Sequence, residues 1–133
     1  MNTPRINLVG NPHWDFQSAL RRVNNNEQLL REISAIFLER MAVMLSNIKL
    51  ALCEGNTEML VMSSHTLKGS AGNMAANPTM EIADRFEELA EKNELASIGP
   101  VWEKLQQETA HLQQTIARWL DDGTSEDTST REW

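Results

Sequence analysis

The residues best suited to chemistry lie in one stretch, SSHTLKGSAGNM, at positions 63–74. It contains His65, with Lys68 three positions later and glycines at 69 and 72. An exposed histidine is mostly neutral at cytoplasmic pH, so its imidazole can act as a nucleophile. Each glycine destabilises a helix interior by about 1 kcal/mol relative to alanine, out of a domain stability of roughly 5–15 kcal/mol. Two such residues within one turn of each other need a reason beyond helix formation.

A helix over this stretch would bring His65 and Lys68 together on its outer surface. Each residue of a helix advances by about 100°, and Leu60 is taken as directed at the core. The apolar stripe then consists of the residues within about 40° of Leu60, namely Ser64, Leu67, Ala71 and Met74. His65 lies roughly 140° away, clear of the core. Its neighbours at i−4, i+3, i+4 and i+7 share one surface patch: Val61, Lys68, Gly69 and Gly72. The sequence therefore predicts an exposed histidine beside a lysine, with no side chain on the next turns of that face.

The segment HTLKGSAGNM resembles the active-site signature of histidine-containing phosphotransfer (HPt) domains, which relay phosphoryl groups in bacterial-type two-component signalling. The resemblance runs from about residue 15 to about residue 120. It includes DFQSALRRVNNNEQLLREISAIFLERMAVML before the histidine and EIADRFEELAE after it. The H-x-L-K-G core is fairly specific when it lies within a helix of a chain of this length. One departure is that Ala75 and Ala76 stand where the family often has Gly-Ala, past the expected phosphorylation face.

The resemblance implies a phosphorelay carrier in which His65 is the phosphoacceptor. The imidazole would attack the acyl phosphate of a receiver-domain aspartate, and the phosphohistidine would then pass its phosphoryl group to another receiver aspartate. Lys68 would screen the phosphoryl charge and donate to its oxygens, while Gly69, Gly72 and Val61 would serve access and partner binding. For Gly72, loose helix packing is an equally open explanation. No cofactor is implied for this chain, because Mg²⁺ is expected on the receiver. The expected partners are response-regulator receivers and a sensor or hybrid histidine kinase, and the protein itself is expected to be a monomer.

Charge and composition argue against several other classes of protein. The net charge of −7 disfavours nucleic-acid binding, which needs a basic face, and docking on an anionic membrane. The chain has no apolar run of about 18 residues that could span a bilayer, and its first residues lack the apolar core of a secretory signal. The single cysteine, Cys53, cannot form an internal disulfide. We therefore expect a cytoplasmic protein.

The elements that would position the histidine are all helical. The 133 residues suffice for one domain. Residues 1–13 are predicted to form an irregular arm and residues 14–23 a short helix. Asn26 is a suitable N-cap for the first long helix, and Gly55 a suitable C-cap. The apolar residues between these caps are spaced by three and four: Leu30, Ile33, Phe37, Met41, Met44, Ile48 and Leu52.

Three more helices follow in the predicted order. Asn56 caps the helix that carries His65, and Asn77 is expected to cap the next one, with Pro78 at its first position. The later helices direct two sets of residues inward, Ile82, Phe86 and Leu89, then Val101, Leu105, Leu112, Ile116 and Trp119. The acidic tail at 121–133 lacks periodicity and is predicted to be disordered. The predicted fold is an all-α, antiparallel up-down four-helix bundle over residues 14–120, with a short extra N-terminal helix.

Two alternatives of other classes stay open. A non-phosphorylated bundle could bind a receiver or kinase as a scaffold or inhibitor, with His65 as an ordinary solvated side chain. The spacing Glu108-x-x-His111 is that of di-iron bundle enzymes, although only one copy is present.

His13 has no partner at a recognisable spacing. Autokinase activity is not expected, because Thr66 follows the histidine where kinase dimerisation domains have an acidic residue, and the chain has no Gly-rich nucleotide loop.

Overall fold

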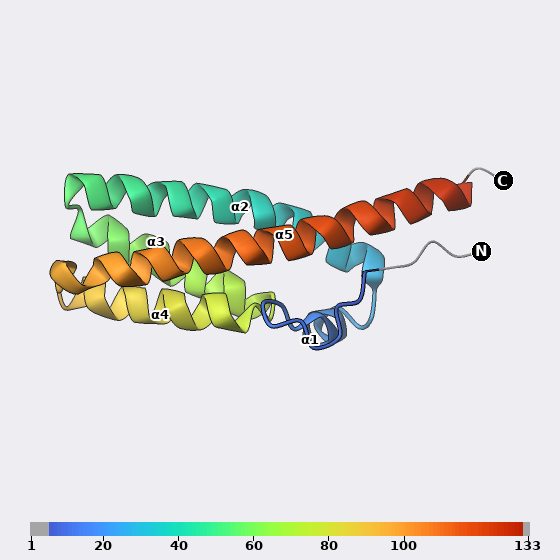
Figure 1. Ribbon diagram of the computed structural model, residues 1–133, viewed down its shortest axis with the longest axis horizontal. Helices are drawn as coiled ribbons and strands as arrows, with labels where there is room; N and C mark the ends of the chain where they lie inside the picture. Colours follow the sequence, from blue (N-terminus) through green and yellow to red (C-terminus); the bar gives the residue numbers. More distant parts are fainter. Residues whose placement is uncertain (1–5, 132–133) are drawn as a thin grey trace.

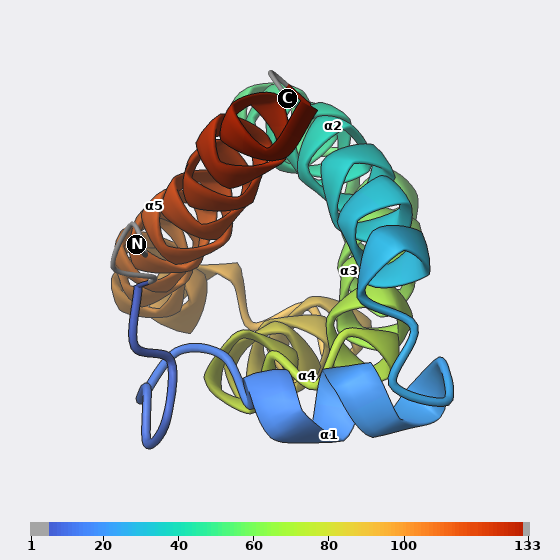
Figure 2. The ribbon, with the colours of Figure 1, turned by 90° about the vertical axis from the view of Figure 1, so that its right-hand side faces the viewer.

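The computed structural model describes the backbone of residues 6–131 and the side chains of residues 6–122. Its elements, in chain order, are α1 (Phe16–Arg22), α2 (Glu27–Glu54), α3 (Thr57–Asn73), α4 (Asn77–Glu91), the short 3-10 helix η1 (Leu95–Ser97) and α5 (Ile98–Arg131). The helices α2 to α5 lie side by side along the long axis of the molecule, and α1 crosses one end (Figure 1). The view along the bundle shows α1 next to the end where α3 and α4 meet (Figure 2). The predicted fold, a four-helix bundle with a short extra N-terminal helix, is confirmed.

The helix boundaries follow local capping chemistry. The side chains of Asn26 and Asn56 accept hydrogen bonds from the N–H groups of Leu29 and Met59, at 3.0 and 3.1 Å. Gly55 ends α2 with φ at +66°, a left-handed conformation that glycine adopts without steric cost. These three predicted caps are confirmed, so the register of α2 and of the start of α3 was readable from the sequence.

The predicted N-cap of α4 is wrong by one residue. Asn77 already lies inside the helix, and Ala76 is the N-cap, without a side-chain hydrogen bond. The reason is the way in which α3 ends. Ala75 takes a φ of +59°, and the N–H of Ala76 donates to the carbonyl of Ala71 at 2.9 Å, which closes α3 as a Schellman motif. The chain is therefore free to begin α4 immediately after Ala76.

The core is formed by the inward faces of all five α-helices. Its largest fully buried apolar side chains are Trp14, Phe86, Leu30, Ile48, Leu60, Leu67, Leu105, Leu112 and Ile116. The predicted apolar stripes are buried with three exceptions, since Ile33, Leu52 and Ile82 are only partly buried against this core. In α4 the small residue Ala83 takes the inward position next to Ile82, which lets α4 approach α3 closely. No helix among the described residues is long and apolar enough to cross a membrane.

Residues 6–13 are irregular and pack on the bundle. Leu8 is buried, and the amide N–H of Ile6 donates to Asp122 Oδ2 at 3.1 Å. The buried indole of Trp14 donates from Nε1 to the carbonyl of Met74 at 2.8 Å. These contacts fasten the arm to α5 and to the α3–α4 turn. Residues 1–5 lie outside the described part of the chain.

The last helix is longer than the sequence predicts. α5 continues to Arg131, whereas a disordered tail is predicted from residue 121 onwards. Once a helix has formed, each added residue contributes a hydrogen bond without a new nucleation step, and no proline follows Trp119 to stop it. Residues 132–133 lie outside the described backbone. The prediction of a disordered tail is therefore wrong for the backbone of residues 121–131.

Candidate functional site

His65 lies on the outer face of α3. The opposite face of this helix is buried and consists of Leu60, Ser63, Ser64, Leu67 and Ala71. The hydroxyl of Ser64 donates to the carbonyl of Leu60 at 2.7 Å, so this polar residue is satisfied within its own helix. The side chain of His65 is 67 % exposed. The structure thus places the histidine where the helical period predicts it.

A carboxylate from α4 orients the imidazole. The Nδ1 atom of His65 lies 3.0 Å from Glu87 Oε2, and the side chain of Glu87 is only 9 % exposed. A carboxylate can only accept a hydrogen bond, so Nδ1 is the nitrogen that carries the hydrogen. In the neutral ring, Nε2 then keeps its lone pair. The result is an exposed imidazole held in the tautomer that can attack an electrophile through Nε2.

Lys68 completes the cluster on the same face. Its Nζ lies 2.8 Å from Glu87 Oε1 and 3.2 Å from Asp84 Oδ1. The hydrogen bond to the Glu87 carboxylate, and after it the one to Asp84, raises the pKa of Lys68 above its ordinary value. The ammonium group therefore stays charged at neutral pH. Glu87 uses one oxygen for the lysine and the other for the histidine, so a single buried carboxylate positions both side chains.

The two glycines of α3 have different surroundings. A Cβ on Gly69 would meet no atom within 4 Å, so no packing contact requires a glycine there. A Cβ on Gly72 would lie 3.1 Å from Met80 Sδ of α4, and the carbonyl of Gly72 accepts a hydrogen bond from Arg22. For Gly72 the sequence leaves access and helix packing open, and the Met80 contact favours packing between α3 and α4. Open space beside the histidine is found at Gly69.

Two further residues flank His65 on its N-terminal side. Val61, a predicted partner-binding residue, is only partly exposed and packs against the core. Met62 precedes the histidine by three positions and is 65 % exposed, although the sequence analysis did not select it. An exposed methionine one turn from the histidine adds apolar surface to the face that carries the imidazole.

Sequence reasoning also missed Glu87 and Asp84. Both lie in the segment EIADRFEELAE, which was matched to the family without assigning a role to either residue. The available signal was the position of Glu87 on the inward face of α4. It follows Phe86 directly, and it lies four positions after Ala83 and three positions before Ala90. All three of these residues are fully buried. A carboxylate at such a position needs a partner, and the partners are found on α3.

The other two histidines form a cluster away from this site. The Nδ1 atom of His13 lies 2.8 Å from Glu108 Oε2, and the His13 and His111 rings stack with centroids 4.8 Å apart. The sequence showed no partner for His13 at a recognisable spacing, and these contacts arise because the arm folds back onto α5. Among the residues that the structure describes, no group of three or more possible ligands could hold a metal ion. The spacing Glu108-x-x-His111 is thus explained by contacts with the arm.

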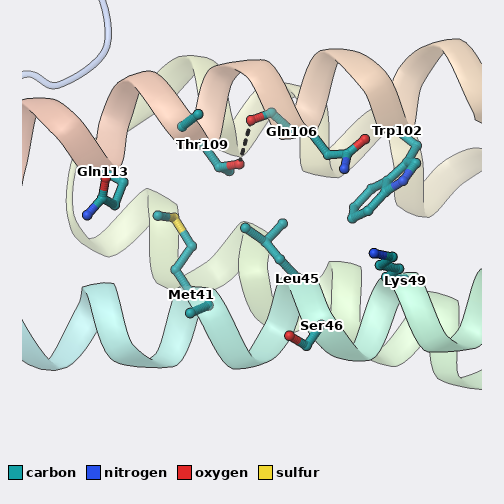
Figure 3. A pocket seen from close by; sticks show the side chains of 10 residues that line it. Met41, Leu45, Ser46, Lys49, Trp102, Gln106, Thr109 and Gln113 are labelled. Atoms are coloured by element: carbon teal, nitrogen blue, oxygen red, sulfur yellow. Dashed lines mark hydrogen bonds between the residues drawn. The ribbon is translucent and has the colours of Figure 1, made fainter.

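A groove of about 360 Å³ between α2 and α5 is a separate concave region. Figure 3 shows Met41, Leu45 and Trp102 lining it, with polar side chains at its edges. The Thr109 side chain of α5 is the hydroxyl that α5 contributes to this groove, and it donates to the carbonyl of Leu105. It also donates to the carbonyl of Gln106 (Figure 3). None of the residues around His65 lines this groove. The chemistry-bearing side chains therefore lie on the α3–α4 face.

The fold and this face define a class of protein: a four-helix bundle that presents one oriented histidine, with a lysine beside it, on the surface of its second long helix. The model of the Hpt domain family matches residues 32–126. The chain therefore belongs to the Hpt domain family, whose function is phosphotransfer.

Two solved structures share the fold. Histidine-containing phosphotransfer protein B (HptB) from Pseudomonas aeruginosa PAO1 superposes with a TM-score of 0.78 and 21 % sequence identity, over 84 % of this chain and 97 % of that one. The HPT domain of the Hpt sensor hybrid histidine kinase from Shewanella gives a TM-score of 0.74 and 15 % identity, over 83 % of this chain and 95 % of the other. A search of curated proteins gave no match.

Proposed function

We propose that this protein is a phosphorelay carrier in which His65 accepts a phosphoryl group from a receiver-domain aspartate and passes it to the aspartate of another receiver. The observation that carries the proposal is the 3.0 Å contact between His65 Nδ1 and Glu87 Oε2. It leaves Nε2 as the nucleophilic nitrogen of a side chain that is two-thirds exposed. A surface histidine without a chemical role needs no buried carboxylate to fix its tautomer.

The transfer step needs no general base, because the attacking nitrogen carries no proton. The lone pair of Nε2 attacks the phosphorus, the Nε2–P bond forms, and the bond from phosphorus to the aspartate oxygen breaks with its electron pair on the leaving carboxylate. Nδ1 keeps its hydrogen, so the imidazole gains positive charge as the bond forms. Glu87 accepts from that N–H and stabilises the charge. The reverse sequence delivers the phosphoryl group to the second receiver.

Lys68 acts on the phosphoryl oxygens. Phosphoryl transfer depends mainly on positioning and on stabilisation of charge spread over the equatorial oxygens. The Lys68 ammonium lies one turn from His65 and is held by Glu87 at 2.8 Å, so its charge is already near the place where the group arrives. Mg²⁺ and the remaining catalytic groups are assigned to the receiver.

The receiver is proposed to dock over α3 and the adjoining side of α2. The exposed apolar residues of α2 recur every seventh position, and we call them the α2 stripe: Leu29, Ile36, Val43 and Leu50. Ile36 also lines a groove of about 270 Å³ together with Ser70 and Asn73 of α3, so the stripe lies on the α3 side of its helix. Together with Met62 and the bare surface at Gly69 on α3, it provides exposed apolar surface that a partner can cover.

The sequence and the fold favour the cytoplasm as the place of this exchange, because the described chain has one cysteine, which is exposed and unpaired.

The test is direct labelling. The purified protein is incubated with a phosphorylated receiver, and the expected product is an acid-labile, base-stable label that is absent from His65→Gln. His111→Gln is the matched control, since it removes another exposed histidine and should be labelled like the wild type. Label on His65→Gln would assign the reaction to another residue. Receiver binding without any label would instead make the protein a scaffold or inhibitor.

A further inference from the structure

Lys68 is shared between two carboxylates that differ in their surroundings. Glu87 is nearly buried and also contacts His65, whereas the side chain of Asp84 is 55 % exposed. The contact that the structure records for Asp84 is the one to Lys68 Nζ, at 3.2 Å. Asp84 thus joins no core contact and does not touch the histidine, yet it holds the lysine that the phosphoryl group needs.

We infer that Asp84 is a positioning residue that competes with the phosphoryl group for Lys68 and so sets how tightly His65 retains it. This inference rests on the function proposed above. When the Nε2–P bond forms and the donor P–O bond breaks, a group with a charge of about −2 arrives beside Lys68. The ammonium can turn to it only by leaving one of its two carboxylates.

The two carboxylates are unequal competitors. Glu87 is held in place by the His65 N–H and by burial, and departure of Lys68 would leave its buried Oε1 atom without a partner. Asp84 is exposed, so water solvates it as soon as the lysine departs, and an exposed ion pair contributes little to stability. The Lys68–Asp84 pair is therefore the one that breaks, and no proton moves in this exchange.

This arrangement suits a carrier. A histidine that bound the phosphoryl group too tightly would not release it to the second receiver. The Lys68–Asp84 contact is present in the unmodified protein and is broken in the phosphohistidine. Because it stabilises only the unmodified protein, it raises the free energy of the phosphohistidine relative to that state. Its loss should make the carrier retain the phosphoryl group longer.

The experiment measures the equilibrium between a phosphorylated receiver and the carrier, together with the half-life of the phosphohistidine. Asp84→Asn should shift the equilibrium toward the phosphohistidine by about threefold, the size of one exposed ion pair. Asp84→Glu keeps the charge and should behave like the wild type. Glu88→Gln removes the same charge from an exposed position of α4 and should leave the equilibrium unchanged.

A double-mutant cycle tests whether Asp84 acts through Lys68. In a Lys68→Met background, Asp84→Asn should produce no further shift. If the threefold shift persists there, Asp84 acts through its field alone and the positioning role is wrong. If the wild type is labelled but the phosphotransfer equilibrium of Asp84→Asn equals that of the wild type, the inference is overturned while the proposed function stands. An unlabelled wild type overturns both.

Discussion

Gly69 and Gly72 should respond differently to substitution, because only Gly72 touches another helix. A Cβ on Gly69 meets open space, whereas one on Gly72 lies 3.1 Å from Met80 Sδ. Gly69→Ala should therefore gain the full difference in helix propensity, about 1 kcal/mol, which corresponds to about 3–5 °C in Tm for a domain of this size. Gly72→Ala gains the same propensity but forces the flexible Met80 side chain to move by a few tenths of an ångström. Its stability should stay within about 0.5 kcal/mol of the wild type.

Function should change in the opposite direction to stability at Gly69. A leucine at this position would stand one turn from His65, on the surface that the receiver must approach. Gly69→Leu should fold at least as stably as the wild type but lose about tenfold or more in kcat/KM for transfer, equivalent to about 1.4 kcal/mol of lost docking. Gly72→Ala is the matched control on the same helix and should transfer at nearly the wild-type rate.

The two measurements are thermal unfolding of the isolated protein and the rate of label transfer at receiver concentrations below saturation. An unchanged rate for Gly69→Leu would refute the access role of this glycine. So would unfolding of the variant, because the glycine would then be needed for packing that the structure does not contain. A Gly72→Ala variant as impaired as Gly69→Leu would show that the receiver reaches further along α3 than proposed.

Three other perturbations follow from the contacts of the site and of the arm. Glu87→Gln keeps a hydrogen-bond acceptor for His65 but loses the charge, so transfer at saturating receiver should slow by about tenfold while docking is unchanged; an unaltered rate would contradict the role of the carboxylate. The raised pKa of Lys68 means that its ion pairs stabilise the fold below the unfolded pKa and are lost as pH rises through the higher folded pKa. The free energy of unfolding should therefore fall less steeply at alkaline pH in Lys68→Met than in the wild type. Identical dependence of stability on alkaline pH in the two proteins would count against the ion pairs. Asp122→Ala releases the N–H of Ile6 and should lower stability by up to about 1 kcal/mol, whereas an unchanged Tm would mean that the arm is held by its apolar contacts alone.

Local features of this protein could be predicted from its amino-acid sequence alone. Asn26, Gly55 and Asn56 act as caps through their own side chains or backbone freedom, so the ends they define did not depend on the rest of the fold. The helical period likewise placed His65 on the face opposite Leu60, because a helix fixes the angle between two residues once its core side is known. The H-x-L-K-G motif then indicated the family without any knowledge of tertiary structure.

Contacts between side chains of different helices could not be predicted in this way. Glu87 lies 22 positions after His65 in the chain, and the pairing exists because small residues such as Ala83 let α4 pack closely on α3. The same approach puts Met80 against Gly72 and leaves Gly69 open, a difference that two glycines in one helix do not reveal by their spacing. Contacts of this kind depend on the relative position and rotation of two packed helices. Those are set by the whole core, whereas the period of a single helix determines only which of its faces is buried.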